Sequence, residues 1–433
     1  MAIASPNTDT SVTVTGTNQS YGAPLATVTT LFFMWGFLTC LNDILVPHLK
    51  SIFDLNYTKV MLIQFAFFGA YFIFSIPSAK VIDWIGYQRS MVAGLLTMGL
   101  GAFLFVPAAS VPSYLLFLGA LIVLAAGITC LQVAANPYVT VLGKPETASS
   151  RLNLTQAFNS LGTFLAPFFG GLFILTAAPN MAGIRALSPD ALQAFRLHEA
   201  ATVKMPYVGL GVALVLLAIA IGSFKLPKIE HAQHQLGQQV NDSIWKHPNL
   251  IFGAIAIFVY VGAEVSIGSF LVNYFSQPEI GGLTEKVAAS FVAFYWGGAM
   301  VGRFIGSALL QKMKTGGLLG ICAVCAAGLV AVSMLTSGHA AMYSIILVGF
   351  FNSIMFPSIF TLGVAELGPL TGDGSGVMIM AIVGGAIIPV AQGWIADRIG
   401  IHHAFFLPVI CYLYILFFAL SGSKPNSERY AKV

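Results

Sequence analysis

Charged side chains are scarce in this sequence. Asp, Glu, Lys and Arg make up 8% of the 433 residues, and hydrophobic residues make up 57%. An ordinary soluble domain carries about 25% charged residues, so this composition excludes a soluble globular protein. The net charge is only +4, and basic residues assigned to one side of a membrane account for it. The sequence therefore predicts a polytopic membrane protein with no nucleic-acid partner.

Motifs that carry catalytic or metal chemistry are missing as well. There is no H-E-x-x-H, no G-x-S-x-G and no histidine cluster within an apolar stretch, which argues against an intramembrane enzyme. Among the five cysteines, Cys322 and Cys325 form a C-x-x-C in an apolar run without a neighbouring His or Asp, which favours packing over redox or metal binding. We expect no metal, no cofactor and no obligate protein partner.

Basic residues are absent from residues 1–22, which are rich in Thr, Ser and Asn. This excludes a basic signal-peptide start and predicts a disordered tail. The rest of the chain contains twelve apolar stretches, and about 20 residues suffice for one helical crossing of a bilayer. The predicted helices cover 25–49, 60–82, 90–108, 114–142, 152–176, 204–225, 248–276, 285–310, 316–336, 340–367, 373–396 and 401–422.

A long polar stretch, 225–249, separates six predicted helices from the other six. We therefore predict an all-α polytopic membrane protein of two six-helix bundles. Its parts are a tail (1–22), an N-terminal bundle (23–225), a cytoplasmic linker (226–247), a C-terminal bundle (248–422) and a second tail (423–433). Most of the 20 Lys and Arg residues fall on the side of the two termini, so both termini are expected in the cytoplasm and the protein in the inner (cytoplasmic) membrane, surrounded by lipid.

The two halves resemble one another at glycine and proline positions in chain order. The aligned pairs are Gly36 with Gly262, Pro137 with Pro357, Gly143 with Gly363, Gly162 with Gly384, and Pro167 with Pro389. Each match is weak alone, but their common order indicates a duplicated six-helix unit. Transporters built from such repeats place the substrate near the bilayer midplane between them.

A carboxylate, Asp43, interrupts the first apolar run, 31–49. An Asp at the centre of a membrane helix costs about 2.5 to 3.5 kcal/mol on insertion scales, so such residues usually face a cavity and serve function. Helical spacing places Trp35 and Asn42 on the same side as Asp43. We predict one wall of an internal polar site here, and the alternative is a protonated Asp that bonds to a neighbouring helix.

Amide side chains recur at helical spacing in two further helices. Gln132 and Asn136 lie in the fourth predicted helix, and Gln156 and Asn159 lie in the fifth. Amides and carboxylates can form paired hydrogen bonds to the neighbouring hydroxyls of a sugar, and aromatic rings can cover its apolar face. The alternatives are hydrogen bonds between helices or, for Asn136, satisfaction of backbone freed by Pro137.

The C-terminal half offers a second carboxylate, Glu264, with Tyr260 one turn before it and Gly268 one turn after it. The small glycine is expected to leave room for a ligand hydroxyl or a cation beside the charge. The alternative is a buried salt bridge to Arg303. Further candidate sugar-binding residues are Gln64, Asn273, Tyr295 and Asn352.

These motifs resemble the fucose, galactose and glucose:proton symporter family of the major facilitator superfamily. The resemblance runs from about Leu31 to Leu420. It rests on WGFLTCLNDILVPHLK (35–50), IQFAFFGAYF (63–72), AANPYVTVLG (134–143), RLNLTQAFNSLG (151–162) and YVGAEVSIGSFLVNYF (260–275). The joint IDWIGYQR (82–89) resembles the superfamily signature G-x-x-x-D-x-x-G-R and keeps Asp83 and Arg89, which with Arg303 are expected to latch the cytoplasmic helix ends. A charge cluster that only sets topology is the alternative.

The resemblance implies alternating access, with Asp43 as the protonation site that couples sugar to ion. Compared with the fucose permease, Gln132 replaces a second carboxylate and Glu264 replaces an amide, a pattern closer to the glucose/galactose branch. It implies hexose uptake driven by H⁺, with Asp43 and Glu264 as ion-coupling residues. Two rival hypotheses stay open: a sodium-coupled sugar symporter, and a drug:proton antiporter, against which the amide stripes argue.

Overall fold

The structure is a computed structural model that describes residues 22–53, 57–111, 113–173, 204–224, 226–227 and 243–425, with a few single residues between 188 and 197. Within these ranges every regular element is a helix, which confirms the all-α prediction. Most of the two predicted tails and most of the predicted linker lie outside the described residues.

The described residues of the first half of the chain form five helices and one short turn of 3-10 helix. They are α1 (Gly22–Phe53), α2 (Tyr57–Ser110), α3 (Tyr114–Val141), η1 (Pro145–Thr147), α4 (Ala148–Phe173) and α7 (Lys204–Ser223). α2 has 54 residues, and a straight helix of that length would measure about 80 Å against a hydrocarbon core of about 30 Å.

A single residue, Gly86, folds α2 back on itself. Its φ of 77° and ψ of 168° leave helical geometry, and this left-handed φ favours glycine. A Cβ at this position would meet nothing within 4 Å, so the backbone angle, and not the available space, requires glycine. α2 thus makes two crossings. The predicted joint between 60–82 and 90–108 shrinks to one residue, which places Asp83 and Arg89 in helical turns.

The second half contains shorter helices, and several of its predicted helices are broken. They are η2 (Ile244–Lys246), α8 (Pro248–Phe275), α9 (Glu285–Leu309), α10 (Thr315–Leu335), α11 (Gly338–Asn352), α12 (Met355–Gly363), η3 (Gly368–Leu370), α13 (Thr371–Met380), η4 (Ala381–Val383), α14 (Gly384–Ile399), α15 (Ile401–Ala404), α16 (Phe406–Phe417) and the π-helical η5 (Phe418–Gly422). The stretch expected as one helix over 340–367 breaks between α11 and α12, just before Pro357, which has no N–H to donate to the Ser353 carbonyl.

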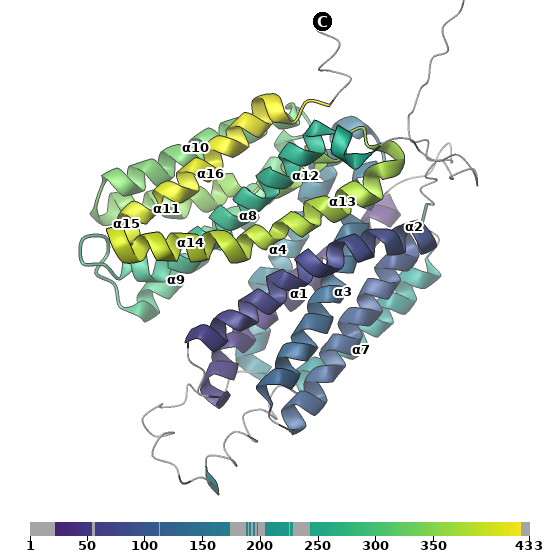
Figure 1. Ribbon diagram of the computed structural model, residues 1–433, viewed down its shortest axis with the longest axis horizontal. Coiled ribbons are helices and arrows are strands. Elements are labelled where there is room, and N and C mark those ends of the chain that lie inside the picture. Colours follow the sequence, from purple (N-terminus) through teal and green to yellow (C-terminus); the bar gives the residue numbers. More distant parts are fainter. Residues whose placement is uncertain are drawn as a thin grey trace, which may run out of the picture.

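Twelve crossings result from these helices. Nine spans in the described part of the chain are long and apolar enough to cross a membrane. The span through α2 contains two crossings, and α1 and α4 supply the remaining two. Helices α1, α2, α3, α4 and α7 pack with one another, as do α8 to α16, and Figure 1 shows the green-to-yellow helices grouped apart from α1, α2, α3 and α7. The predicted fold of two six-helix bundles is confirmed.

Glycines at equivalent positions bring two helix pairs into close contact. A Cβ at Gly36 on α1 would overlap the Asn159 carbonyl of α4, and a Cβ at Gly162 on α4 would overlap the Phe33 carbonyl of α1. On α14, a Cβ at Gly384 would overlap the Phe258 carbonyl of α8. The space beside Gly262 on α8 is similarly filled by the side chain of Ile388 on α14. These are the glycines that the sequence repeat aligns, and they let the backbones approach closely.

Successive crossings run in opposite directions, which places several features at one end of the molecule. The start of α1, the Gly86 break, the turn between α3 and α4, and the end of η5 all lie there. We call this the terminal end.

Candidate functional site

The amides of α3 and α4 are buried, and several of their polar atoms lack a protein partner. Gln132 is 1% exposed, Asn136 0% and Gln156 5%. Gln132 donates a hydrogen bond from Nε2 to the Tyr71 hydroxyl of α2 at 2.6 Å. Its Oε1, both amide atoms of Asn136 and Nε2 of Gln156 have no hydrogen-bond partner among the described residues.

Such unpaired groups are costly, at about 1 to 3 kcal/mol each. They are therefore atoms that would gain from a polar ligand. The alternative that Asn136 satisfies backbone freed by Pro137 is wrong in this structure, because the hydroxyl of Ser375 on α13 binds that carbonyl, Val133 O, at 2.9 Å.

Asn159 instead ties two helices together. Its Nδ2 donates to the Phe32 carbonyl of α1 at 2.9 Å, and Thr163 donates to the Gly36 carbonyl at 3.3 Å. Trp35 is buried against Phe32, with ring centroids 5.2 Å apart. Asn159 therefore has the helix-to-helix role that was its alternative to sugar binding.

Three predicted site residues lie where the structure gives no side-chain detail. Asn42 and Asp43 belong to α1 and Gln64 belongs to α2, but their side chains lie outside the described residues. Their assignment to the site stays a prediction from the sequence.

The second carboxylate, Glu264, lies in a network of aromatic and polar side chains in the C-terminal bundle. The Tyr260 hydroxyl donates to Glu264 Oε1 at 2.8 Å and also lies 3.1 Å from the Asn352 carbonyl. The Asn352 amide donates to the Tyr295 hydroxyl at 2.8 Å. Arg303 Nη2 is 4.0 Å from Glu264 Oε1, and both side chains are nearly buried. The structure thus joins four predicted residues and also supports the salt bridge to Arg303.

One expectation about this network is wrong, and one candidate residue lies apart from it. The space beside Gly268 is filled by Trp296, because a Cβ on Gly268 would lie 2.9 Å from the indole. Asn273 is exposed. It follows Glu264 on α8 by more than two turns, a rise of about 13 Å, so the structure does not bring it together with Glu264.

Charged residues bridge the two bundles at the terminal end, but of the expected latch residues Asp83, Arg89 and Arg303 only Asp83 is among them, because Arg303 pairs with Glu264. Lys80 Nζ lies 2.8 Å from Asp373 Oδ1 on α13 and 3.5 Å from Asp83 Oδ2. Arg89 is exposed and takes part in none of the ion pairs found in the described ranges. The sequence motif located the right helix end but missed Lys80 and Asp373. The sequence did offer one signal for this cluster, because Lys80 lies about one helical turn before Asp83 of the signature.

Hydroxyl groups make further contacts between the bundles at this end. The Ser150 and Ser307 hydroxyls each donate to the other's carbonyl, at 2.7 and 3.1 Å. Ser149 on α4 lies 2.6 Å from the Thr361 hydroxyl on α12. The two bundles are therefore closed against each other at the terminal end.

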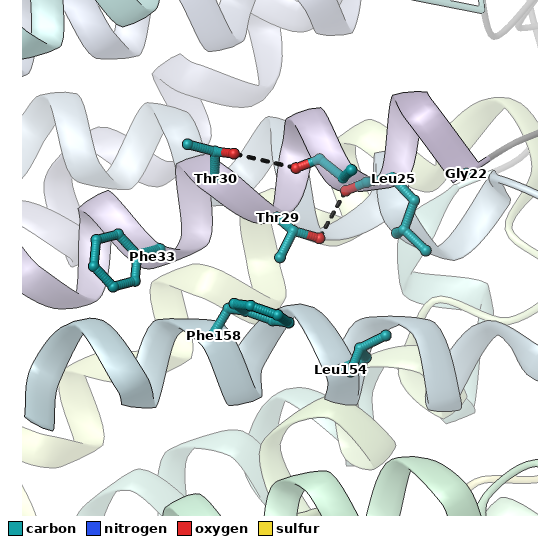
Figure 2. A pocket seen from close by; sticks show the side chains of 8 residues that line it. Gly22, Leu25, Thr29, Thr30, Phe33, Leu154 and Phe158 are labelled. Atoms are coloured by element: carbon teal, nitrogen blue, oxygen red, sulfur yellow. Dashed lines mark hydrogen bonds between the residues drawn. The ribbon is translucent and has the colours of Figure 1, made fainter.

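An apolar groove lies between α1 and α4, near the start of both helices. It has a volume of about 410 Å³, and its lining includes Leu25, Phe33, Leu154 and Phe158. Figure 2 shows that the hydroxyls of Thr29 and Thr30 are used within α1. The groove lacks the free polar groups that a sugar needs, so it is not the predicted site.

Comparisons with known proteins place the chain beside sugar transporters. Residues 26–382 match the model of the Major Facilitator Superfamily. The "Glucose/galactose transporter" of Brucella abortus biovar 1 (strain 9-941) is 53% identical over 98% of this chain and 100% of its own length.

Two crystal structures of the fucose:proton symporter FucP share the architecture. The E. coli FucP structure matches with a TM-score of 0.87 and 34% identity, over 94% of this chain and 100% of that chain. A structure of FucP in the outward conformation has the same TM-score and coverage, with 33% identity.

Proposed function

The chain belongs to the Major Facilitator Superfamily, and from that premise we propose that it takes up a hexose of the glucose/galactose type by symport with protons through alternating access. It is a transporter and not an enzyme. The observation that carries the proposal is the end-to-end similarity to a glucose/galactose transporter. The buried, unpartnered amide atoms of Gln132, Asn136 and Gln156 agree with it.

A sugar matches these amides better than an apolar substrate does. A hexose presents hydroxyls that both donate and accept, and an amide offers both functions in one side chain. A drug-type substrate would leave the buried amide atoms unpaired. Tyr260, Tyr295 and Asn352 supply matching groups in the other bundle, so a sugar bound between the halves would contact both.

Coupling to an ion is assigned to Asp43 and Glu264. The FucP relatives are named as proton symporters, which favours H⁺. Carboxylate, amide and carbonyl oxygens also suit Na⁺, and a sodium-coupled symporter is therefore the second candidate. Closure at the terminal end, together with the match to an outward conformation, supports an outward-facing state with cytoplasmic termini in the inner membrane.

Reconstitution into liposomes tests the proposal directly. Purified protein should exchange labelled glucose or galactose in counterflow, and it should accumulate the sugar when the outside is made more acidic. Accumulation under a Na⁺ gradient but not a pH gradient would identify the sodium symporter. Absence of sugar exchange under every condition would favour the antiporter.

Gln132→Met should weaken sugar binding. The substitution keeps the volume but removes the NH₂ group that donates and the carbonyl oxygen that accepts, and a lost buried hydrogen bond costs about 1 to 3 kcal/mol. The half-saturating sugar concentration in counterflow should rise about tenfold or more. Gln88→Met is the matched control, because the Gln88 amide donates to the carbonyls of Ile221 and Phe224 near the terminal end. Equal shifts in both variants would remove Gln132 from the site.

Breaking the ion pair of Lys80 with Asp373 should have only a small effect. The two side chains are 51% and 28% exposed, and exposed pairs contribute at most about 1 kcal/mol. Asp373→Asn should therefore change the counterflow rate by less than about fivefold, and the difference should shrink in high salt. A loss of a hundredfold or more would show that this pair controls closure.

A further inference from the structure

One arginine contacts both bundles and the buried acid at once. Arg303 lies on α9, where its Nη2 faces Glu264 at 4.0 Å and its Nε donates to the Ser353 carbonyl at 3.2 Å. Its Nη1 donates to the hydroxyl of Ser160, which belongs to α4 of the N-terminal bundle. The guanidinium therefore has two partners in its own bundle and one across the interface.

The contact with Ser353 depends on a proline. In an unbroken helix the Ser353 carbonyl would accept from the N–H of residue 357, but Pro357 has none. The carbonyl is therefore free to hold the guanidinium. This second anchor keeps Arg303 pointed at the interface while Glu264 supplies the opposite charge.

The backbone of Arg303 is also part of the interface. Asn153 of α4 donates to the Arg303 carbonyl at 2.7 Å, and Ser307, one turn further along α9, bonds to Ser150. Phe304 packs edge-on against Phe158, with centroids 6.0 Å apart. Any force that moves Arg303 is thus applied where α9 meets α4.

The charge balance around Glu264 is simple. The titratable groups that face it in the described structure are Arg303 and the tyrosines Tyr260, Tyr295 and Tyr412, and tyrosines are ordinarily neutral near pH 7. Arg303 is the cation that balances Glu264. A buried arginine without its carboxylate partner is an uncompensated charge, which is strongly unfavourable. Hydration of the guanidinium would lower that free-energy cost.

We propose that Arg303 is a positioning residue that couples the charge of Glu264 to the contacts between α4 and α9. While Glu264 is charged, its carboxylate balances the positive charge of the guanidinium. Arg303 then stays buried against Ser160, which keeps the terminal end closed. When Glu264 gains a proton or turns to a bound ligand, the unpaired guanidinium favours hydration, and the α4 and α9 contacts separate. The inference rests on the proposed function only in treating the two bundles as moving parts.

A distance measurement across the terminal end tests this proposal without any sugar. Spin labels attached through Lys144→Cys and Lys312→Cys, both exposed positions in loops of opposite bundles, report separation by double electron-electron resonance in nanodiscs. The background lacks the five native cysteines. Glu264→Gln should raise the long-distance fraction at least threefold, and Ser160→Ala should raise it about twofold.

The decisive variant is the double substitution Glu264→Gln with Arg303→Gln. It leaves no unpaired charge, so its long-distance fraction should return towards that of the parent. Arg303→Lys, which retains the positive charge, should also stay close to the parent. Asp397→Asn is the control, because this exposed carboxylate lies on α14 at the opposite end.

Two results would overturn the proposal. One is a Glu264→Gln variant with an unchanged distance distribution. The other is a double variant as open as Glu264→Gln alone, which would indicate lost packing and not charge. If Glu264→Gln does not fold, Glu264→Asp keeps the charge but withdraws it from Arg303, and its long-distance fraction should be intermediate. Because no sugar is present, failure here differs from failure of the transport assay.

Discussion

Asp43→Asn should leave sugar exchange intact and abolish accumulation. Asparagine has the shape of the protonated acid but cannot release a proton. The carrier should still bind sugar and alternate, so counterflow should proceed within about threefold of the parent rate. With an acidic exterior, however, labelled hexose inside the liposomes should only reach the external concentration.

The control for this experiment is Glu146→Gln. Glu146 is an exposed carboxylate in η1 at the terminal end, outside the predicted coupling path, so its removal should leave gradient-driven uptake unchanged. Full accumulation by Asp43→Asn would take Asp43 out of the coupling role and leave Glu264 as the remaining candidate.

Gly36→Ala should destabilise the N-terminal bundle severely. The added methyl group would overlap the Asn159 carbonyl, so α1 and α4 must separate. The hydrogen bonds from Asn159 to Phe32 and from Thr163 to Gly36 would weaken with them. Overpacking of this kind costs about 1 to 3 kcal/mol, and the lost bonds place Gly36→Ala at the upper limit. The apparent melting temperature of the detergent-solubilised protein should fall by roughly 5 to 10 °C.

Gly69→Ala provides the matched control in the same bundle. Nothing lies within 4 Å of a Cβ at Gly69 on α2, and alanine is the better helix former by up to about 1 kcal/mol. The melting temperature of Gly69→Ala should be equal to that of the parent protein or slightly higher. Gly384→Ala should repeat the loss in the other bundle, and normal melting of Gly36→Ala would contradict the α1–α4 contact.

The helices and the duplication could be predicted from the sequence because they depend on local hydropathy and on small residues in order. The close approach of Gly36 to α4, and of Gly384 to α8, agrees with the aligned pairs. The hairpin at Gly86 was harder, because hydropathy marks a polar joint but not a backbone angle at one residue.

The partners of individual side chains could not be predicted in the same way. Lys80 and Asp373 are far apart in the chain, and only the packing of α2 on α13 brings them together. Asn159 and Gln132 look alike in sequence, yet one bonds to a neighbouring backbone and the other keeps an unpaired oxygen. Helical spacing assigns a residue to a face, but the neighbour on that face decides its role.

The prolines Pro137 and Pro357 occupy equivalent places in the two halves, and each releases a main-chain acceptor one turn earlier. The carbonyl released by Pro137 accepts from Ser375 of the opposite half, whereas the one released by Pro357 accepts from Arg303 of its own half. Since these acceptors are backbone atoms, the side chains at positions 133 and 353 can be substituted without loss of either hydrogen bond. The prolines cannot be substituted in the same way, because another residue would supply an N–H to the carbonyl. The two equivalent carbonyls therefore differ in their partners: Val133 O is bound by a side chain of the other bundle and Ser353 O by a side chain of its own bundle. Substitutions confined to positions 133 and 353 would not reveal this difference.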